Sequence, residues 1–267
     1  YGGIIPEQAA REQIKSIIPV IEESLQAAGK KPQDLDAIAV TEGPGLIGSL
    51  LVGVETAKVL ATIWDKPLIP VNHLIGHFYA NWIGDETPSF PCIGLLVSGG
   101  HTDLVLFTDH NKYKYLGGTR DDAAGECFDK CARLLGLPYP GGPEISRLSK
   151  GANPAAFALP RPMLGSYDFD FSFSGLKTAV SNVILNEVKN LSRMRVSNKL
   201  RDPSALPQDD KADLAASIEA AIIEVLVEKT IRAAQKYEVE QIMVAGGVAA
   251  NLRLKEEFET RCKELGI

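Results

Sequence analysis

The chain has 267 residues, of which 45% are hydrophobic and 23% are charged, and its formal net charge at pH 7 is −6. This length allows one large domain or two lobes with a substantial buried core, and the composition excludes a disordered, collagen-like or coiled-coil protein. The acidic balance argues against indiscriminate nucleic-acid binding, and four cysteines without paired spacing indicate the reduced thiols of a cytoplasmic protein. No apolar run approaches the roughly 20 residues of a membrane span and no signal segment opens the chain, so we expect no membrane partner.

The first part of the chain predicts helices that alternate with short strands. Apolar residues recur at helical spacing over residues 7–29, where Pro19 is expected to kink or split the helix. The elements expected next are strand 35–40, a helix to about residue 63, strand 67–71 and helix 73–82, with Asn72 as the cap of that last helix.

The rest of the chain continues this alternation. The expected elements are hairpin strands 93–97 and 103–108, helix 123–135, the Pro/Gly loop 137–143, strand 169–173, a helix from 176 to 186, helix 213–237, strand 241–244 and helix 252–265. Residues 187–210 are polar and basic, and we interpret them as a loop insertion. Strands that alternate with helices and hairpins predict an α/β protein whose mixed sheets are covered by helices.

Three apolar strands are each followed by glycines, in Gly43-Pro44-Gly45, Ser98-Gly99-Gly100 and Gly246-Gly247. Backbone N–H groups in such loops can approach an anionic ligand, and three loops at strand ends predict one crevice that they line together. Each loop taken alone is explained equally well as a tight turn. None has the Gly-Lys-Ser/Thr ending of a Walker A loop or a clean dinucleotide-binding fingerprint.

Two of the four histidines, His73 and His77, stand four residues apart on one expected helix. At this spacing both imidazoles lie on one face and can bind one metal ion, whereas the alternative is a packed or surface pair. Leu74 follows the first histidine, where a zinc protease of the His-Glu-x-x-His type needs its glutamate. Cys127 and Cys131 have the same spacing, but no second thiol pair exists, so we interpret them as core residues.

Carboxylates gather at the start of the helix expected over residues 123–135. Glu126 and Asp129 share one face of it and can hold sugar hydroxyls or a metal, whereas the alternative is that the acidic residues only complement the helix dipole. Asn251 stands at the start of the last helix, where it either caps that helix or contacts a ligand with its amide.

These motifs together resemble the TsaD family of tRNA N6-adenosine threonylcarbamoyltransferases. The matching stretches are Tyr1 to Glu7, Gly43 to Leu46, Asn72 to His77, Leu96 to Thr102, Asp121 to Lys130, Tyr139 to Pro143, Phe171 to Lys177 and Ala245 to Asn251. The resemblance implies an actin-like ATPase fold of the sugar-kinase type, with a first lobe over 1–90 and a second over 91–267. It also implies an acyltransferase, which passes the threonylcarbamoyl group of threonylcarbamoyl-adenylate to N6 of the adenosine beside the anticodon, in tRNAs that read codons starting with A.

The resemblance further implies a site and its partners. It makes His73 and His77 the ligands of one divalent metal, iron ahead of zinc, with adenylate or ATP in the cleft. The substrate-binding positions that it implies are Leu96, Val97, Ser98, Gly99, Gly100, Asp129, Gly142 and Asn251. No general base emerges from the sequence. The implied partners are tRNA, threonylcarbamoyl-adenylate, and TsaB-like and TsaE-like subunits.

Measured against the family pattern, the chain is expected to be truncated at both ends. The family's N-terminal hairpin would precede Tyr1, and a third metal ligand, an aspartate, would follow Ile267, so we expect weak or no activity from this chain alone. The basic insertion is interpreted as a loop in preference to a tRNA contact.

Three other functions remain as alternatives. A sugar-kinase-type enzyme of the same fold explains the glycine loops but not the histidine pair. A catalytically silent partner subunit of this fold would lack the two histidines. A metalloprotease is disfavoured by Leu74.

Overall fold

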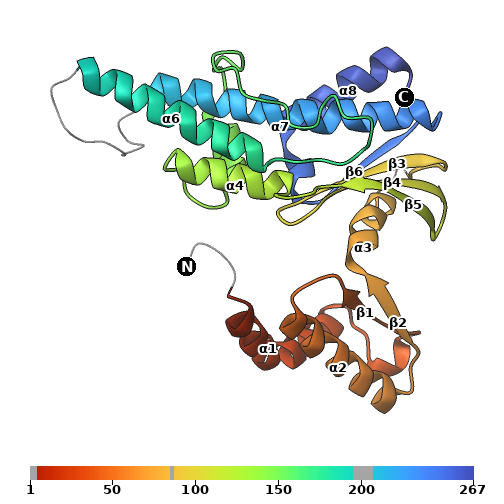
Figure 1. Cartoon of the computed structure of the whole chain (residues 1–267). Helices are drawn as coiled ribbons and strands as arrows, with labels where there is room; N and C mark the ends of the chain where they lie inside the picture. Colours follow the sequence, from red (N-terminus) through yellow and green to blue (C-terminus); the bar gives the residue numbers. More distant parts are fainter. Residues whose placement is uncertain (1–4, 85–86, 195–206) are drawn as a thin grey trace. The chain divides into compact units, whose positions relative to one another are not determined.

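The computed structural model describes residues 5–84, 87–194 and 207–267. It divides into two compact units, one that ends at Tyr79 and one that starts at Ala80 (Figure 1). This division lies at the end of the histidine helix, ahead of the position near residue 90 expected from the resemblance. Each unit is described by itself below.

The first unit is built around a parallel pair of strands. Its elements are α1 (Pro6–Ala27), η1 (Pro32–Asp34), β1 (Ile38–Gly43), α2 (Ile47–Trp64), β2 (Leu68–Asn72) and α3 (His73–Tyr79). β1 pairs with β2 from Ile38 opposite Leu68 to Gly43 opposite Asn72. Parallel strands need a crossover connection, which α2 supplies. α1 continues through Pro19, so of the kink or split expected at this residue the split is absent.

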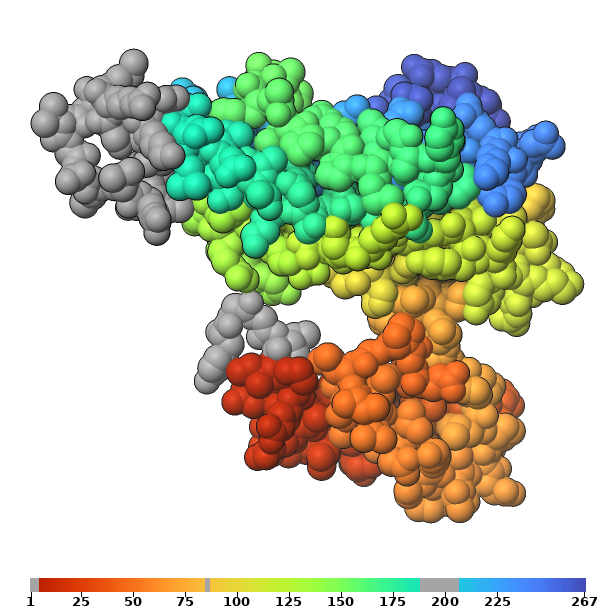
Figure 2. Space-filling model, in the orientation of Figure 1, coloured from red at the N-terminus to blue at the C-terminus, as the bar shows by residue number. Residues whose placement is uncertain are grey.

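The helices of the first unit bury little surface. No residue of α1 is buried and only Ala57 of α2 is. Apolar side chains such as Ile47 and Ile63, which are 76% and 70% exposed, therefore lie at the surface of this unit. Figure 2 shows the molecular surface coloured along the sequence. Among the described residues α2 alone is long and apolar enough to cross a membrane, and core helices of soluble proteins pass the same test of length and composition. α2 also carries the ion pair of Glu55 with Lys58 at 2.7 Å.

The described part of the second unit contains a four-stranded mixed sheet and five α-helices. Its elements are η2 (Ala80–Trp82), β3 (Cys92–Val97), β4 (Thr102–Asp109), β5 (Lys112–Gly118), α4 (Ala124–Leu134), α5 (Gly141–Leu148), α6 (Ser174–Met194), α7 (Gln208–Lys236), β6 (Ile242–Ala245), η4 (Gly247–Ala250) and α8 (Leu252–Leu265). The strand order is β5-β4-β3-β6, with β3 and β6 parallel and the other pairs antiparallel.

The core of the second unit lies between the central strand and α7. All residues of β3 are buried, and α7 packs against β3 and against α4, α5 and α8 (Figure 1). Buried side chains recur along α7 from Leu214 to Ala234. A continuous apolar strand of this kind is typical of a sheet position that is covered on both faces. Because β3 and β6 are parallel, the loops that follow them, at Ser98 and Gly246, leave the same edge of the sheet.

Two elements of the sheet differ from the sequence-based expectation. β5 was not predicted, because its exposed Lys112-Tyr113-Lys114-Tyr115 alternation lacks the apolar face of an internal strand; it is the edge strand of the sheet. Residues 169–173 form no strand, and their only ladder contact among the described residues is an isolated bridge between Phe171 and Thr119.

Two helices also differ. The Pro/Gly loop expected over 137–143 turns into α5 at Gly141. α6 begins at Ser174 and continues to Met194, so the first part of the expected insertion 187–210 is helical. Residues 195–206 of that insertion lie outside the described residues.

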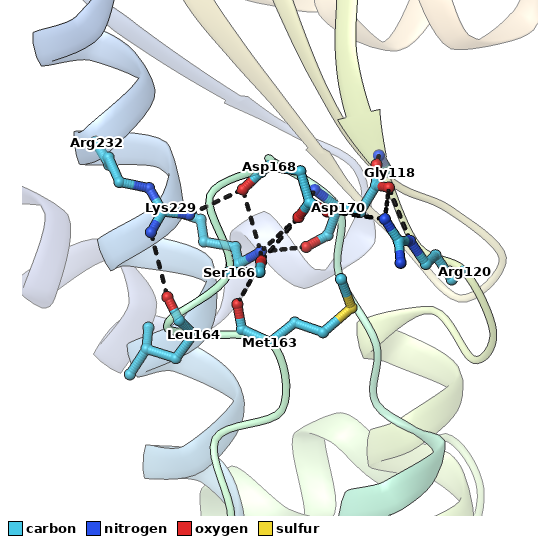
Figure 3. A network of polar contacts seen from close by, with 9 residues as sticks. All are labelled: Gly118, Arg120, Met163, Leu164, Ser166, Asp168, Asp170, Lys229 and Arg232. Carbon is cyan, nitrogen blue, oxygen red and sulfur yellow. Dashed lines mark hydrogen bonds and ion pairs between the residues drawn. The ribbon is translucent and has the colours of Figure 1, made fainter.

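A buried lysine attaches the loop that follows residue 160 to α7 (Figure 3). Lys229 of α7 is fully buried, and its Nζ donates to Ser166 Oγ at 2.8 Å and to the carbonyl oxygen of Asp170. Arg120 forms ion pairs with Asp168 at 2.8 Å and with Asp170 at 2.7 Å on the other side of the loop. Burial, only partly offset by the Asp168 carboxylate 3.6 Å away, lowers the pKa of Lys229.

Candidate functional site

The histidine pair opens α3 in the first unit. Asn72 caps this helix as expected, because its Oδ1 accepts hydrogen bonds from the backbone N–H groups of Leu74 at 2.9 Å and Ile75 at 3.3 Å. One turn of helix then separates His73 from His77, whose Nε2 atoms lie 3.2 Å apart with the ring planes at 68°.

This separation fits chelation of one metal ion. Two nitrogens that each lie about 2.1 Å from a shared ion are separated by about 3.0 Å at a 90° ligand angle and by about 3.4 Å at the tetrahedral angle. The observed 3.2 Å between the Nε2 atoms of His73 and His77 falls between these limits. Within the described residues no cluster of three or more His, Cys, Asp or Glu side chains surrounds an ion position. The geometry of the pair is therefore compatible with two ligands of one metal ion.

The cysteine pair is part of the core of the second unit, as expected. Cys127 and Cys131 are fully buried with their sulfur atoms 4.0 Å apart. The hydrogen bond with Cys131, together with burial, raises the pKa of Cys127 far above that of an exposed thiol. A thiol that stays protonated is a poor metal ligand and a poor nucleophile.

A cavity of about 890 Å³ opens beside the glycine loops of the second unit. Of the sequence-predicted positions, Gly99, Asp129, Gly142 and Asn251 line it. The others, Leu96, Val97, Ser98 and Gly100, are not among its lining residues, and the first two are fully buried strand residues. The volume lies within the range of small-molecule and cofactor sites.

Two of the three glycine loops meet at this cavity. Gly99 and Gly247 both line it, since they follow the adjacent parallel strands β3 and β6. Gly246 has φ +93°, and a Cβ atom there would lie 2.4 Å from the carbonyl oxygen of Val97, so only glycine fits. The third loop, at Gly43, belongs to the first unit.

Asp129 is the carboxylate of the acidic motif that faces the cavity. Its Oδ1 accepts a 2.6 Å hydrogen bond from the backbone N–H of Gly141, which ties α4 to the start of α5. No described residue donates to its Oδ2, which is thus available to a ligand hydroxyl. Glu126 is bound instead to Lys130 at 2.9 Å. The two carboxylates that share a helix face therefore have different roles.

A second carboxylate, Glu219, lines the cavity from α7 and is only 3% exposed. It accepts hydrogen bonds from Ser146 Oγ at 2.6 Å, Ser149 Oγ at 2.7 Å and Asn251 Nδ2 at 2.8 Å. Asn251 also caps α8, since its Oδ1 accepts from the N–H of Leu254 at 2.9 Å. The sequence analysis did not assign Glu219 or the two serines to the site, because residues that are 32 and 73 positions apart meet only in the folded chain.

The mouth of the cavity carries mixed charge. Arg147, Lys150 and Arg253 are among its lining residues, together with Glu256. Arg147 is engaged with Glu144 at 2.6 Å. Cations at the rim and carboxylates inside suit a ligand with an anionic end and a hydroxyl-bearing end.

Comparison with known proteins identifies relatives along the whole chain. The family described as "TsaD: tRNA N6-adenosine threonylcarbamoyltransferase" matches residues 1–267. A curated relative of that name from Thermomicrobium roseum is 52% identical over 97% of this chain and 73% of its own length. One from Burkholderia thailandensis is 50% identical over 100% of this chain and 74% of its own length.

Solved structures show the same kind of fold at low sequence identity. HypF from T. kodakarensis matches with a TM-score of 0.58 and 14% identity, over 92% of this chain and 39% of that one. Component A of (R)-2-hydroxyglutaryl-CoA dehydratase from Acidaminococcus fermentans matches with a TM-score of 0.50 and 15% identity, over 92% and 73%. The chain therefore has the actin-like ATPase fold expected from the sequence.

Proposed function

Because the chain belongs to the TsaD family of tRNA N6-adenosine threonylcarbamoyltransferases, we propose that it transfers a threonylcarbamoyl group to N6 of a tRNA adenosine. It is an acyltransferase that modifies tRNA. The observation that carries the proposal is the family match over residues 1–267, with relatives about half identical over nearly all of the chain. The names of these relatives support neither the kinase, the silent-subunit nor the protease alternative.

The proposed donor is threonylcarbamoyl-adenylate, and the acceptor is the adenosine beside the anticodon in tRNAs that read codons starting with A. In this transfer the N6 nitrogen forms a bond to the carbamoyl carbon, the bond from that carbon to the phosphate oxygen breaks, and AMP leaves. The amine loses one proton, for which no side chain is assigned as general base. Because an adenine amine is a weak nucleophile, orientation and electrostatic stabilisation must supply most of the acceleration.

The cavity of the second unit is the proposed nucleotide site. Asp129 Oδ2 would accept a hydrogen bond from a ribose hydroxyl, while its Oδ1 stays bound to the N–H of Gly141. Gly99 and Gly142 leave space for a ligand to approach the backbone. Lys150 at the rim would attract the phosphate end.

His73 and His77 are the proposed metal ligands, supported by the 3.2 Å between their Nε2 atoms. A bound divalent metal, iron ahead of zinc in this proposal, would supply Lewis-acid polarisation of donor oxygen atoms. TsaB-like and TsaE-like subunits and a cytoplasmic location complete the proposal, and they are supported by the family resemblance alone.

Reconstitution tests the proposal directly. The chain, extended to the full length of its family relatives, is purified and incubated with threonine, bicarbonate, ATP, an adenylate-forming enzyme, partner subunits and unmodified tRNA, and threonylcarbamoyladenosine is measured by mass spectrometry of nucleosides. Product that depends on this protein is the expected result. Its absence, with folded protein and active partners, would contradict the transferase function.

Histidine variants test the metal site separately. His73→Ala and His77→Ala should each lose bound metal, measured by elemental analysis, and should lose product formation. His110→Ala, which removes a histidine from the β4–β5 turn of the second unit, is the matched control and should retain both. Metal content that is equal in all three variants would show that the pair is not the metal site.

A further inference from the structure

The second unit contains a second cavity, of about 460 Å³, between α7, α8 and the loop of residues 154–161. Its volume lies within the range of small-molecule sites. Phe157 and Ala158 of the loop and Ala220 and Ile223 of α7 give it an apolar wall. Arg253 is the one described residue that lines both this cavity and the proposed nucleotide cavity, so the two are neighbours that share a wall.

The loop that forms one side of the second cavity is fixed to α7 at both ends. The backbone N–H of Asn153 donates to Asp213 Oδ1 at 2.8 Å, and Arg161 Nε donates to Glu224 Oε2 at 2.7 Å. The second contact is an ion pair inside the cavity lining, so these two charges satisfy each other. The cavity is therefore formed by the protein alone, and the ordering of this loop adds little cost to the binding of a ligand.

Two other charged side chains of the lining, Arg253 and Glu257, are available to a ligand. They stand one helical turn apart on α8, so they lie on the same face. Neither forms an ion pair with any residue that the structure describes, whereas Lys255 and Glu259 of the same helix are paired at 3.7 Å. The Arg253 guanidinium, which has five N–H donors, makes one long hydrogen bond, from Nη1 to the carbonyl oxygen of Ala216 at 3.5 Å.

A free cation, a free anion and an apolar wall define the chemistry of the ligand. A simple anion would satisfy Arg253 but be repelled by Glu257, and a simple cation would have the reverse problem. A zwitterion with an apolar group satisfies all three features. Four residues of helix rise about 6 Å, and the long side chains of arginine and glutamate can close this spacing around a ligand whose two charges are adjacent.

We propose that the second cavity binds a free α-amino acid with an apolar side chain. Arg253 holds the carboxylate, Glu257 holds the ammonium group, and the side chain lies against Ala220 and Ile223. This site is independent of the proposed transferase function, because neither a nucleotide nor tRNA takes part in it.

Three related ligands test which charges the cavity recognises. L-leucine carries both charges, isocaproate lacks the ammonium group, and L-leucinamide lacks the carboxylate. Each is titrated against the chain extended to the full length of its relatives, with ligand-observed NMR as the readout. L-leucine should bind with a Kd of about 1 mM, and each analogue should bind at least about fivefold more weakly. Analogues that bind as tightly as L-leucine, or no binding of L-leucine at about 20 mM, would overturn the proposal.

Charge variants assign each preference to one side chain. In Glu257→Gln the preference for L-leucine over isocaproate should vanish, and in Arg253→Gln the preference over L-leucinamide should vanish. Glu259→Gln is the matched control, because Glu259 is exposed on the same helix and lines neither cavity; it should keep both preferences. A preference for L-leucine over isocaproate that persists in Glu257→Gln would show that Glu257 does not hold the ammonium group.

A bulky substitution tests the location of the site. Ala158→Trp fills the cavity from the exposed side of the loop and should abolish binding of L-leucine while the thermal midpoint stays unchanged. Ala156→Trp, at an exposed position of the same loop outside the lining, should bind L-leucine as the starting protein does. Equal binding of L-leucine by the two tryptophan variants would place the amino acid elsewhere and overturn the proposal.

Discussion

Replacement of the buried Lys229 by methionine should destabilise the second unit. Lys229→Met preserves the apolar stem of the side chain but removes the donors to Ser166 Oγ and to the carbonyl oxygen of Asp170. Hydrogen bonds from a charged group contribute about 1.5–3 kcal/mol each, so the two together are worth about 3–6 kcal/mol. Release of a cation from a site where burial lowers its pKa offsets part of this loss. We expect a net decrease of about 2–3 kcal/mol in the free energy of unfolding.

Urea denaturation measures this change. With a slope of about 2 kcal/mol per molar urea, the transition midpoint should fall by about 1–1.5 M while the slope stays the same. Lys236→Met is the matched control on the same helix, because this lysine is exposed and its ammonium lies over the rings of Phe169 at 5.1 Å and Tyr237 at 5.9 Å. The Lys236→Met substitution should lower the free energy of unfolding by less than about 1 kcal/mol. Equal midpoints for the two variants would refute the reasoning that the buried ammonium holds the loop.

Three further predictions concern acid stability, a glycine and the thiols. Burial raises the pKa of Asp121, but hydrogen bonds from Ser172, Ser174 and the start of α6 outweigh it and lower this pKa. The ionised carboxylate therefore stabilises the folded state fully above pH 3.8, and this stabilisation is lost as the pH falls further. In urea titrations Asp121→Asn should cost about 1 kcal/mol at pH 7 and less below pH 3.8; a constant difference would contradict this. Gly246→Ala, with its Cβ 2.4 Å from a β3 carbonyl, should lower the thermal midpoint by several degrees and weaken ADP binding, and an unchanged midpoint would contradict the close contact. A thiol reagent at pH 8 should modify Cys262 first, since the other three cysteines are buried, and mass mapping of the labelled protein would reveal any other order.

The local elements of this protein could be predicted where the pattern of apolar residues had room to repeat. The α1, α2, α7 and α8 helices and the hairpin of β3 with β4 all have enough residues to show a helical or a strand period. Asn72 was predicted as a cap and capping was one of the two roles considered for Asn251, because capping depends only on the next few residues. α5 was missed, since one short helix that starts at Gly141 within a Pro/Gly stretch shows no period. β5 was missed for a related reason, because an exposed edge strand has no buried face to mark it.

The sequence by itself determined the family, the three glycine loops and the spacing of His73 and His77, because each of these is a property of neighbouring residues. Only the tertiary structure decided which polar residues lost contact with water. It buried Glu219 beside Asn251 and Lys229 beside Ser166, pairs that are 32 and 63 residues apart. It also gave Asp129 a free oxygen at the cavity and left Glu126 with Lys130, although both carboxylates share one helix face. The reason is physical: the free energy of a charged side chain depends on the donors and the water around it, and these are supplied by segments that meet only when the chain folds.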